Sequence, residues 1–388
     1  MNRKRRSIYL CYALNFASAV CLTIISPSLP RFAQGFRLDL GEMGLLLTIE
    51  FIGFTAFAFC AGIVSDRIGK RKTVLLAMII LTIAVFLLTF SPNYPVLCIV
   101  LLFMGGGFGI METMSNALLS DICDEGETVY QLNLMSCFFG IGAFIGPVLT
   151  GLAYSNGMSW RTVYQVLGFF LAALTLWFAL NKLPTLPFTE KIKLIDIKNL
   201  VVDKKFLLIC LCMFLYTGSE VGSWGWMSEF CESVMQFTVI ESSIAVAVFW
   251  VAMTISRFVV ARLLRKVDLR KFIMVLALAA GVISAVMGIM DHKVFVWIII
   301  VLLGAACSSQ WSMIVSYGAE IYKRNTGTVF AMLVASGGIG MSFVPGAMGF
   351  SAEHIGLRGS LVFPAALFAL IAAVFIIIPK IAPKSENT

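Results

Sequence analysis

Long apolar stretches alternate with short polar connections along the whole chain. An α-helix rises about 1.5 Å per residue, so a helix needs about 20 apolar residues to cross the hydrocarbon core of a bilayer. Twelve stretches reach this length, and we expect an all-α membrane protein with twelve transmembrane helices. The expected spans are 7–29, 42–64, 73–90, 96–119, 130–154, 161–181, 206–228, 241–263, 272–290, 294–318, 327–350 and 360–379.

One polar connection, residues 182–205, is much longer than the others. It is charged and contains Pro184 and Pro187, neither of which favours continuation of a helix. We therefore expect a bundle of six helices over residues 1–181, a cytoplasmic central loop over 182–205, and a second six-helix bundle over 206–388.

A glycine–proline pattern recurs in the two expected bundles. A shift of 198 residues places Gly140, Gly142, Pro147 and Gly151 on Gly338, Gly340, Pro345 and Gly349. The same shift places Glu112 on Gln310. Duplicated helical halves are typical of transporters that bind their solute near the bilayer midplane, so the pattern predicts two pseudo-symmetric bundles.

Composition supports a membrane protein. The 388 residues are 60% hydrophobic and 13% charged, whereas soluble domains carry about a quarter charged residues. So few charges cannot cover a surface in water, and lipid must cover much of it.

The distribution of Lys and Arg predicts the orientation. With the N-terminus inside, most of the 29 basic residues fall in cytoplasmic connections, which places both termini in the cytoplasm and the protein in the inner or plasma membrane. The net charge of +8 then needs no nucleic-acid partner. On the outside we place Arg31, Arg37, Arg161, Lys293 and Arg358.

Three carboxylates fall well inside expected spans, namely Glu50, Glu112 and Glu220. Charges within a bilayer are costly and usually functional. Arg257 lies closer to the cytoplasmic end of its span, so the three acids lack an obvious basic partner at their own depth. A carboxyl group that exchanges a proton could couple proton flow to transport.

Polar and aromatic residues recur at helical spacing around two of these acids. Such a mixture suits a sugar, whose ring faces stack on aromatic groups and whose hydroxyls form hydrogen bonds. A structural hydrogen bond between helices is the alternative for each acid, and packing or an interfacial position is the alternative for each tryptophan. The candidate solute or proton residues are Asn15, Glu50, Glu112, Asn116, Tyr216, Glu220, Trp224, Gln310 and Trp311.

The connection after the second span reads Gly62-Ile-Val-Ser-Asp66-Arg67-Ile-Gly69-Lys-Arg71-Lys. It resembles the signature loop of the major facilitator superfamily at every fixed position. That resemblance implies the superfamily fold and a role for Asp66 and Arg67 in latching the cytoplasmic gate. A basic loop that only sets the orientation is the alternative.

A narrower resemblance concerns the fourth and seventh spans. The pattern Gly-x-Gly-x-x-Glu-Thr-x-x-Asn from Gly107 to Asn116 is similar to the fourth helix of the fucose–proton symporter family, and Gly218 to Trp224 is similar to its seventh helix. The resemblance implies that Glu112 binds sugar and shares in proton coupling. The acid in the first helix of that family's prototype has no counterpart here, where Asn15 is the nearest polar residue, so Glu50 or Glu220 could substitute.

The fifth span carries Gly142, Gly146 and Pro147, which partly resemble the fifth-helix motif of drug–proton antiporters. Stripes of small residues also serve helix packing, and that is the alternative. The fourth span lacks the arginine that is typical of those antiporters.

These observations favour proton-coupled uptake of a sugar or sugar derivative by alternating access. Export of drugs or metabolites by proton antiport is the first alternative, and a receptor or scaffold without transport is the second. Since no nucleophile–base pair, phosphate loop or metal spacing occurs, we expect no enzyme activity, cofactor or metal. We expect a monomer whose partners are a small carbohydrate, protons and membrane lipid.

Overall fold

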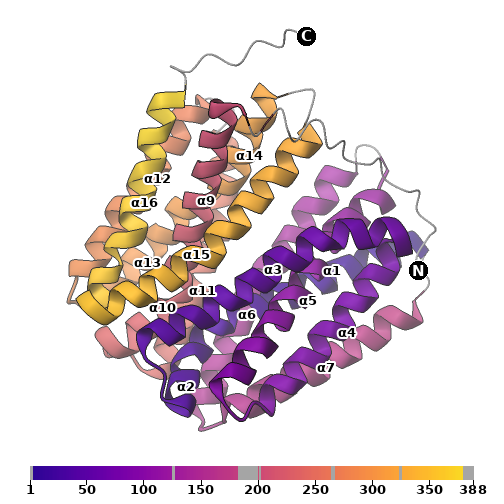
Figure 1. The fold of residues 1–388 in the computed structure, drawn as a ribbon, viewed down its shortest axis with the longest axis horizontal. Coiled ribbons are helices and arrows are strands. Elements are labelled where there is room, and N and C mark those ends of the chain that lie inside the picture. Colours follow the sequence, from indigo (N-terminus) through magenta and orange to yellow (C-terminus); the bar gives the residue numbers. More distant parts are fainter. Residues whose placement is uncertain are drawn as a thin grey trace.

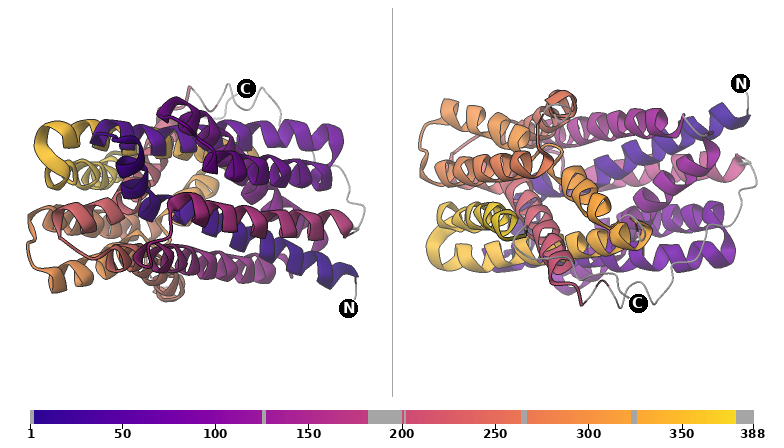
Figure 2. Two further views of the ribbon diagram at one scale, coloured as in Figure 1. Left: turned by 90° about the horizontal axis from the view of Figure 1, so that it is seen from below. Right: turned by 90° about the horizontal axis from the view of Figure 1, so that it is seen from above.

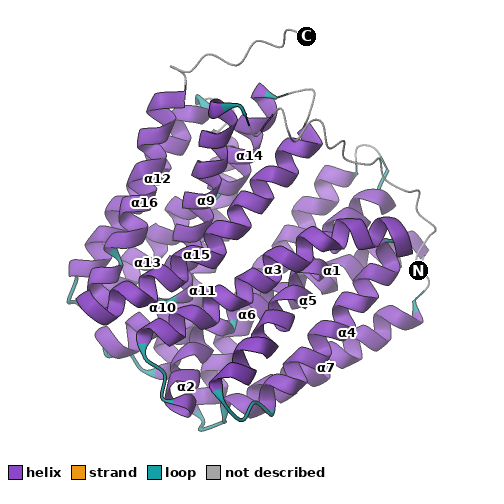
Figure 3. Ribbon diagram, viewed as in Figure 1, coloured by secondary structure: helices purple, strands orange, loops and turns teal. Residues whose placement is uncertain are grey.

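The computed structural model describes residues 3–124, 127–181, 200, 202–263, 267–322 and 326–378. Within these ranges the chain folds into helices and loops without a β-strand (Figure 3). The expected central loop falls almost entirely outside the described residues.

The first half contains seven described helices, because the first expected span is interrupted. They are α1 (Arg3–Thr23), α2 (Ile25–Phe36), α3 (Leu40–Ile68), α4 (Lys70–Thr89), α5 (Tyr94–Ile122), α6 (Thr128–Ser155) and α7 (Trp160–Leu180).

The second half contains α9 (Lys204–Gly225), α10 (Met227–Glu229), the π-helical turn η1 (Phe230–Val234), α11 (Val239–Leu263), α12 (Leu269–Ile289), α13 (Lys293–Cys307), α14 (Gln310–Ile321), α15 (Thr326–Ser360) and α16 (Val362–Ile377). Across the described ranges, 11 helical segments are long and apolar enough to cross a membrane, and the shorter α16 occupies the place of the twelfth expected span. The all-α fold with twelve membrane helices is confirmed.

Side-chain caps explain several helix starts. Asp39 begins α3 with a capping box, since its carboxylate accepts the N–H of Glu42 while Glu42 accepts the N–H of Asp39. Asn93 and Asp203 begin α5 and α9 by accepting backbone N–H groups two or three residues ahead. These polar residues fix where each span leaves the apolar layer.

Three expected spans are broken where the sequence analysis drew continuous helices. The first breaks at Ile24, because Pro27 lacks the N–H group that would bond to the carbonyl of Thr23, and it then continues as α2 to Phe36. The seventh breaks at Trp226, between α9 and α10. The tenth breaks at Ser308 and Ser309, and Ser309 has a left-handed φ of 62°.

Both termini lie on one side of the molecule, which we call the terminal side, and α2 and α10 lie on the opposite, far side (Figure 1). The long helices run roughly alongside one another between these two sides (Figure 2). In Figure 1 the ribbons of the two halves meet toward the far side and diverge toward the terminal side.

The two halves repeat each other in their packing. A side chain at Gly142 would collide with the carbonyl oxygen of Phe16, and one at Gly340 would collide with that of Phe214. Both pairs are related by the shift of 198 residues found in the sequence. The pseudo-symmetry expected from the glycine pattern is thus present in the fold.

Helices α3 and α15 form the largest contact between the halves, and it extends only part of the way along them. On the far side, the N–H of Gly41 donates to Glu353 Oε1 at 2.9 Å, and near the middle Gly338 packs against Thr55. One and two turns beyond Thr55, Phe59 is 69% exposed and nothing lies within 4 Å of a Cβ placed on Gly62. The halves are therefore closed on the far side and separated on the terminal side.

A second contact between the halves, between α6 and α11, follows the same course. Gly151 packs against Ser243 on the far side, and Gly140 packs against Thr254 nearer the middle. Tyr130, toward the terminal end of α6, is 66% exposed.

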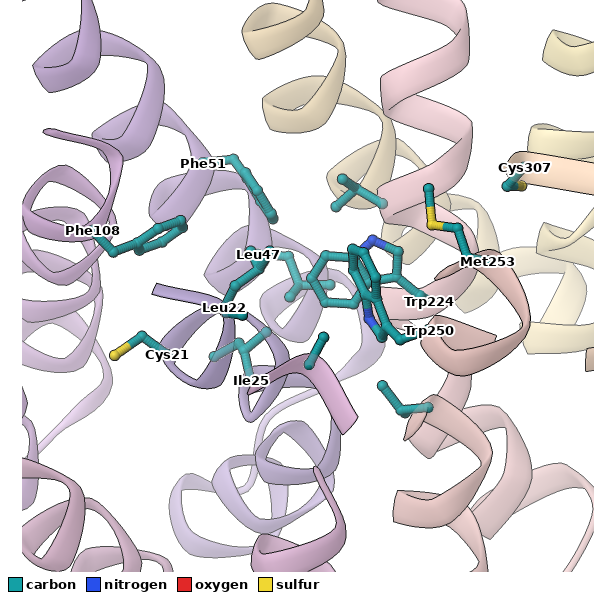
Figure 4. Close-up of a cluster of buried hydrophobic side chains, with 14 of the residues drawn as sticks. Cys21, Leu22, Ile25, Leu47, Phe51, Phe108, Trp224, Trp250, Met253 and Cys307 are labelled. Carbon is teal, nitrogen blue, oxygen red and sulfur yellow. The ribbon is translucent and has the colours of Figure 1, made fainter. Parts of the chain in front are cut away.

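An aromatic cluster joins the halves where these contacts converge (Figure 4). Trp224 is 1% exposed and lies between Phe51, at a ring-centroid distance of 6.3 Å, and Trp250, at 5.7 Å. We call Phe51, Trp224 and Trp250 the central aromatic cluster.

Candidate functional site

The three membrane carboxylates occupy different environments, and Glu50 is separate from the other two. Its side chain is 0% exposed, and neither carboxyl oxygen has a hydrogen-bond partner among the described residues. Gly105 of α5 packs against its backbone, and Cys21 and Tyr164 are close enough to interact with it electrostatically. Glu50 thus points into the first half, and the structure does not bring it to the other candidate residues.

Glu112 is half-buried on α5. One turn toward the far side on the same helix face, Gly109 packs against Phe54 of α3. The Asn116 side chain donates to the backbone carbonyl of Glu112 at 2.9 Å and leaves the carboxylate free. Within the described chain no hydrogen bond or ion pair to this carboxylate is found, which leaves it available to a proton or a solute.

Glu220 of α9 is also half-buried, beside Tyr216. The hydroxyl of Tyr216 donates to the carbonyl oxygen of Cys307 at 2.8 Å, at the end of α13. Tyr216 therefore holds α9 against the break in the tenth span. Glu220, one turn further along α9, lies beside Tyr216.

Arg257 is the basic neighbour that the sequence analysis did not assign to Glu220. It lies within electrostatic range of both Glu220 and Tyr216, but no ion pair joins it to Glu220 in the described ranges. The sequence contained the signal, because side chains lean toward the N-terminus of their helix. Since α11 begins on the far side, the Arg257 side chain leans toward the middle of the membrane. Helix α9 runs in the opposite direction, so the Glu220 side chain leans toward the depth of Arg257.

The tenth-span candidates are divided by the helix break. Gln310 is fully buried at the start of α14, where its Nε2 donates to the carbonyl of Ala306 at 2.8 Å and its Oε1 has no partner in the described part of the chain. Trp311 is 36% exposed and packs edge-on against Phe330. Of these two candidates, Gln310 lies on the interior face of α14 and Trp311 does not.

Asn15 and Trp224 lie inside the protein for different reasons. Asn15 is 4% exposed, and its Oδ1 finds no partner among described residues. Trp224 is packed within the central aromatic cluster, so in this conformation it closes the far side and is not an open stacking surface.

The loop after α3 divides into an anchored part and a free part. Lys70 forms an ion pair with Asp121 at 2.5 Å, and Arg71 donates to the carbonyl oxygens of Ala179 and Asn181 at 3.0 Å. Gly69 makes the tight turn with a φ of 86°.

Asp66 and Arg67 form the free part of this loop, since both are exposed and neither has an ion-pair partner in the described ranges. Gly62 makes no close helix contact in this conformation, since nothing lies within 4 Å of a Cβ placed on it. The two residues expected to latch the gate are therefore unengaged on the separated side.

The fifth-span motif packs α6 against the first span. A side chain at Gly142 would meet Phe16 and Ala19, and one at Gly146 would meet Thr23 at 2.9 Å, while Pro147 lies within the helix. This arrangement agrees with the packing alternative for the motif.

Comparison with known proteins identifies the family. The model of the Major Facilitator Superfamily matches residues 10–301 and again 209–388. The chain belongs to the Major Facilitator Superfamily. As a member of this superfamily it is a multi-pass membrane transporter and not an enzyme.

Curated relatives include proteins called TsgA homologs. The one from Buchnera aphidicola subsp. Baizongia pistaciae is 23% identical over 334 residues, which cover 86% of this chain and 84% of that protein. A second, from Yersinia pestis, is 20% identical over 336 residues and covers the same shares.

Solved structures share the superfamily fold. The transporter FucP in the outward conformation is 20% identical, with a TM-score of 0.67 over 97% of this chain and 99% of that chain. A bacterial homolog of the human lysosomal transporter Spinster, inward-facing and occupied, is 15% identical with a TM-score of 0.82 over 100% of both chains.

Proposed function

We propose that this transporter takes up a sugar or sugar derivative together with a proton, across the inner or plasma membrane and with both termini in the cytoplasm. The observation that carries the proposal is the unpaired, half-buried carboxylate of Glu112, one turn beyond the contact of Gly109 with Phe54 of α3. A carboxylate in this position can exchange a proton with water on the open side and accept hydrogen bonds from sugar hydroxyls.

Two features support a sugar as cargo. The fourth-span pattern around Glu112 resembles that of fucose–proton symporters, and the solved structures that share the fold include the fucose:proton symporter of E. coli and a D-xylose-proton symporter. Their identities of 20% and 13% establish the fold alone, so the assignment of cargo rests on the residues.

Alternating access follows from the contacts between the halves. With the terminal side in the cytoplasm, the structure is the inward-open state, closed outside by the central aromatic cluster and by the far-side ends of α3 and α15. Release of these contacts and closure on the cytoplasmic side would produce the outward-open state. We also propose that residues 1–181 and 206–388 form the two moving bodies and that residues 182–205 connect them.

Reconstitution into proteoliposomes tests this function. Under an imposed inward proton gradient, the wild-type protein should accumulate at least one labelled monosaccharide or derivative above its equilibrium level. Glu112→Gln should abolish accumulation while the variant still folds, because the amide keeps the shape but cannot carry the proton. Glu42→Gln, at the far-side start of α3, is the matched control and should accumulate the same cargo.

Two outcomes would contradict the proposal. Drug or metabolite movement against the opposite proton gradient would establish the antiport exporter instead. Absence of any movement, with folded protein and intact vesicles, would support a receptor or scaffold.

A further inference from the structure

Arg257 lies on the face of α11 that meets the first half. Trp250 on this face belongs to the central aromatic cluster, and Thr254 contacts Gly140 of α6. Arg257 follows one turn later, roughly 9 Å before the end of α11 at Leu263. Its Nη2 lies 4.0 Å from the sulfur of Met253, one turn deeper in the membrane. The guanidinium group is thus directed toward the membrane centre.

This guanidinium lacks a direct counter-ion. No carboxylate of the described chain lies within 4.0 Å of Arg257, although Glu220 is within electrostatic range. An arginine held inside the membrane is costly unless it pairs with an anion or faces water. Arg31, Lys70 and Arg358, near the ends of the spans, all have direct carboxylate partners.

The break in the tenth span adds a second source of positive charge, the N-terminal end of α14. Helix α14 begins at Gln310, inside the membrane, without a side-chain cap on its first turn. The uncapped N–H groups of a helix start carry partial positive charge and favour anions. Two side chains beside this start, Ser308 and Gln310, are 0% exposed, and Ser308 Oγ and Gln310 Oε1 have no partner within the described ranges.

Arg257 and this helix start belong to one neighbourhood. Tyr216 donates to the carbonyl of Cys307, immediately before the break, and it also interacts electrostatically with Arg257. Glu220 interacts electrostatically with both Arg257 and Cys307. In Figure 4, Met253 appears between Trp224, at the boundary of the halves, and Cys307, farther into the second half.

We propose that the cargo carries a carboxylate group, as an acidic sugar derivative does, and that Arg257 and the N-terminal end of α14 bind it. This inference rests on the proposed transport function and narrows its cargo. A charged Glu220 competes with the cargo carboxylate for Arg257, whereas a protonated Glu220 leaves Arg257 to the cargo. Binding of the acidic cargo would then be favoured when Glu220 is protonated.

Paired probes test the charge of the cargo. Purified protein is heated with glucuronate or glucose, and with galacturonate or galactose, at equal concentration and ionic strength. At least one acid should raise the Tm, and its neutral partner should not. Neutral sugars that raise the Tm as much as the acids, or a panel in which no acid raises it, would overturn the inference.

Substitutions locate the site for any acid that binds. Arg257→Gln should weaken binding of that acid by roughly tenfold to a hundredfold, the usual effect of losing a charged hydrogen-bond partner. Arg257→Lys should restore part of the affinity, which a merely structural arginine would not require. Arg262→Gln, exposed on the same helix, is the matched control and should bind like the wild type. Unchanged affinity in Arg257→Gln would remove this residue from the site.

Transport separates this inference from the function on which it rests. Proton-driven accumulation of a neutral sugar, with no effect of Arg257→Gln, would contradict the acidic cargo and leave the proton–sugar symport intact. Binding of an acid that depends on Arg257, but without movement across the vesicle membrane, would contradict transport and leave the anion site intact.

Discussion

The hydroxyl of Ser26 donates a 2.9 Å hydrogen bond to the backbone carbonyl of Trp224, a residue 198 positions further along the chain. The same offset relates the glycine motifs of the two halves, so these residues occupy equivalent positions in the repeat. Each lies beside the break in the first helix of its half, at Ile24 and at Trp226. The bond therefore joins the two halves close to their pseudo-symmetry axis, on the side that is closed.

The far-side contact of α3 with α15 predicts a way to shift the conformation. A side chain at Gly44 would lie 3.0 Å from the carbonyl of Pro345 and 3.1 Å from the Cα of Gly349. Gly44→Leu should disfavour the far-closed state by about 1–3 kcal/mol, as overpacking does. Hydrogen–deuterium exchange should then rise in α2 and α10 and fall near Asp66.

Gly142→Leu is the control for this shift, because the atoms nearest to a Cβ on Gly142 belong to Phe16 and Ala19 of α1, in the same half. It should lower the Tm without changing the ratio of exchange between the two sides. Equal exchange patterns in the Gly44 and Gly142 variants would contradict the two-body interpretation.

An ion pair between Arg31 of α2 and Glu232 of η1 also joins the halves on the far side. Both side chains are mostly buried, and Ser242 donates to the other oxygen of Glu232 at 2.9 Å. Arg31→Glu should lower the Tm, and the swap Arg31→Glu with Glu232→Arg should recover part of the loss. We expect a coupling energy of about 1–3 kcal/mol, between the values for exposed and buried pairs.

The exposed pair Arg358–Asp291, within the second half, provides the comparison. The same swap there should show a coupling below about 1 kcal/mol. An equally weak coupling for Arg31 and Glu232 would show that this pair does not stabilise the closed side.

The antiparallel register of α3 and α15 predicts the partner of Asp66. Thr55 packs against Gly338, so extending the antiparallel register by eleven residues along each helix would place Asp66 opposite Gly327, in the first turn of α15, once the helices close. A carboxylate near a helix start is stabilised by about 0.3–1 kcal/mol, and by up to about 2 kcal/mol when partly buried. Asp66→Asn should therefore slow turnover several-fold and leave cargo affinity unchanged.

Stopped-flow uptake and equilibrium binding measure these two quantities separately. Asp124→Asn, on the same side but paired with Lys4 of its own half, should leave turnover unchanged. If Asp66→Asn lowered the affinity for the cargo without changing turnover, a gating role for Asp66 would be rejected.

The buried position of Glu50 predicts that this residue is not needed for proton coupling or for the stability of the fold. The contact of its carbonyl with Gly105 is repeated in the second half by Phe249 and Gly304, so an apolar residue fills the equivalent place. Burying an unpaired polar group costs about 1–3 kcal/mol. Glu50→Gln should fold at least as stably as the wild type and accumulate cargo normally, as measured by Tm and proteoliposome uptake. Binding without proton-driven accumulation would instead make Glu50 the proton carrier.

The sequence predicted the fold well because apolar length and small-residue spacing determine it. The span limits were too short wherever a capped helix continues beyond the apolar layer, as α3 does from Leu40 to Ile68. The breaks at Ile24, Trp226 and Ser309 were missed because hydropathy stays high across them. The proline at position 27 was the one local signal for a break.

The candidate site was predicted less completely. Helical spacing correctly placed Glu220 and Tyr216 on one face, but it could not tell that Glu50 points into its own half. That distinction depends on which helix packs against the residue. Here Gly105 allows α5 to approach the backbone of Glu50 closely. Arg257 was set aside because of its depth along the chain, although the lean of its side chain carries the charge further inward.

The interrupted tenth span has a continuous equivalent in α5, which runs unbroken from Tyr94 to Ile122 and carries Glu112. The two halves thus place polar groups inside the membrane in different ways. The first half has an ionisable side chain on an unbroken helix, and the second half has the uncapped N–H groups of a helix start together with an arginine. The two halves therefore differ in the charge that they offer a solute, since the first half presents the Glu112 carboxylate and the second half presents Arg257 and a helix start. A hybrid built from two copies of the first half would keep the acid but would lack the positive charge that an acidic cargo requires.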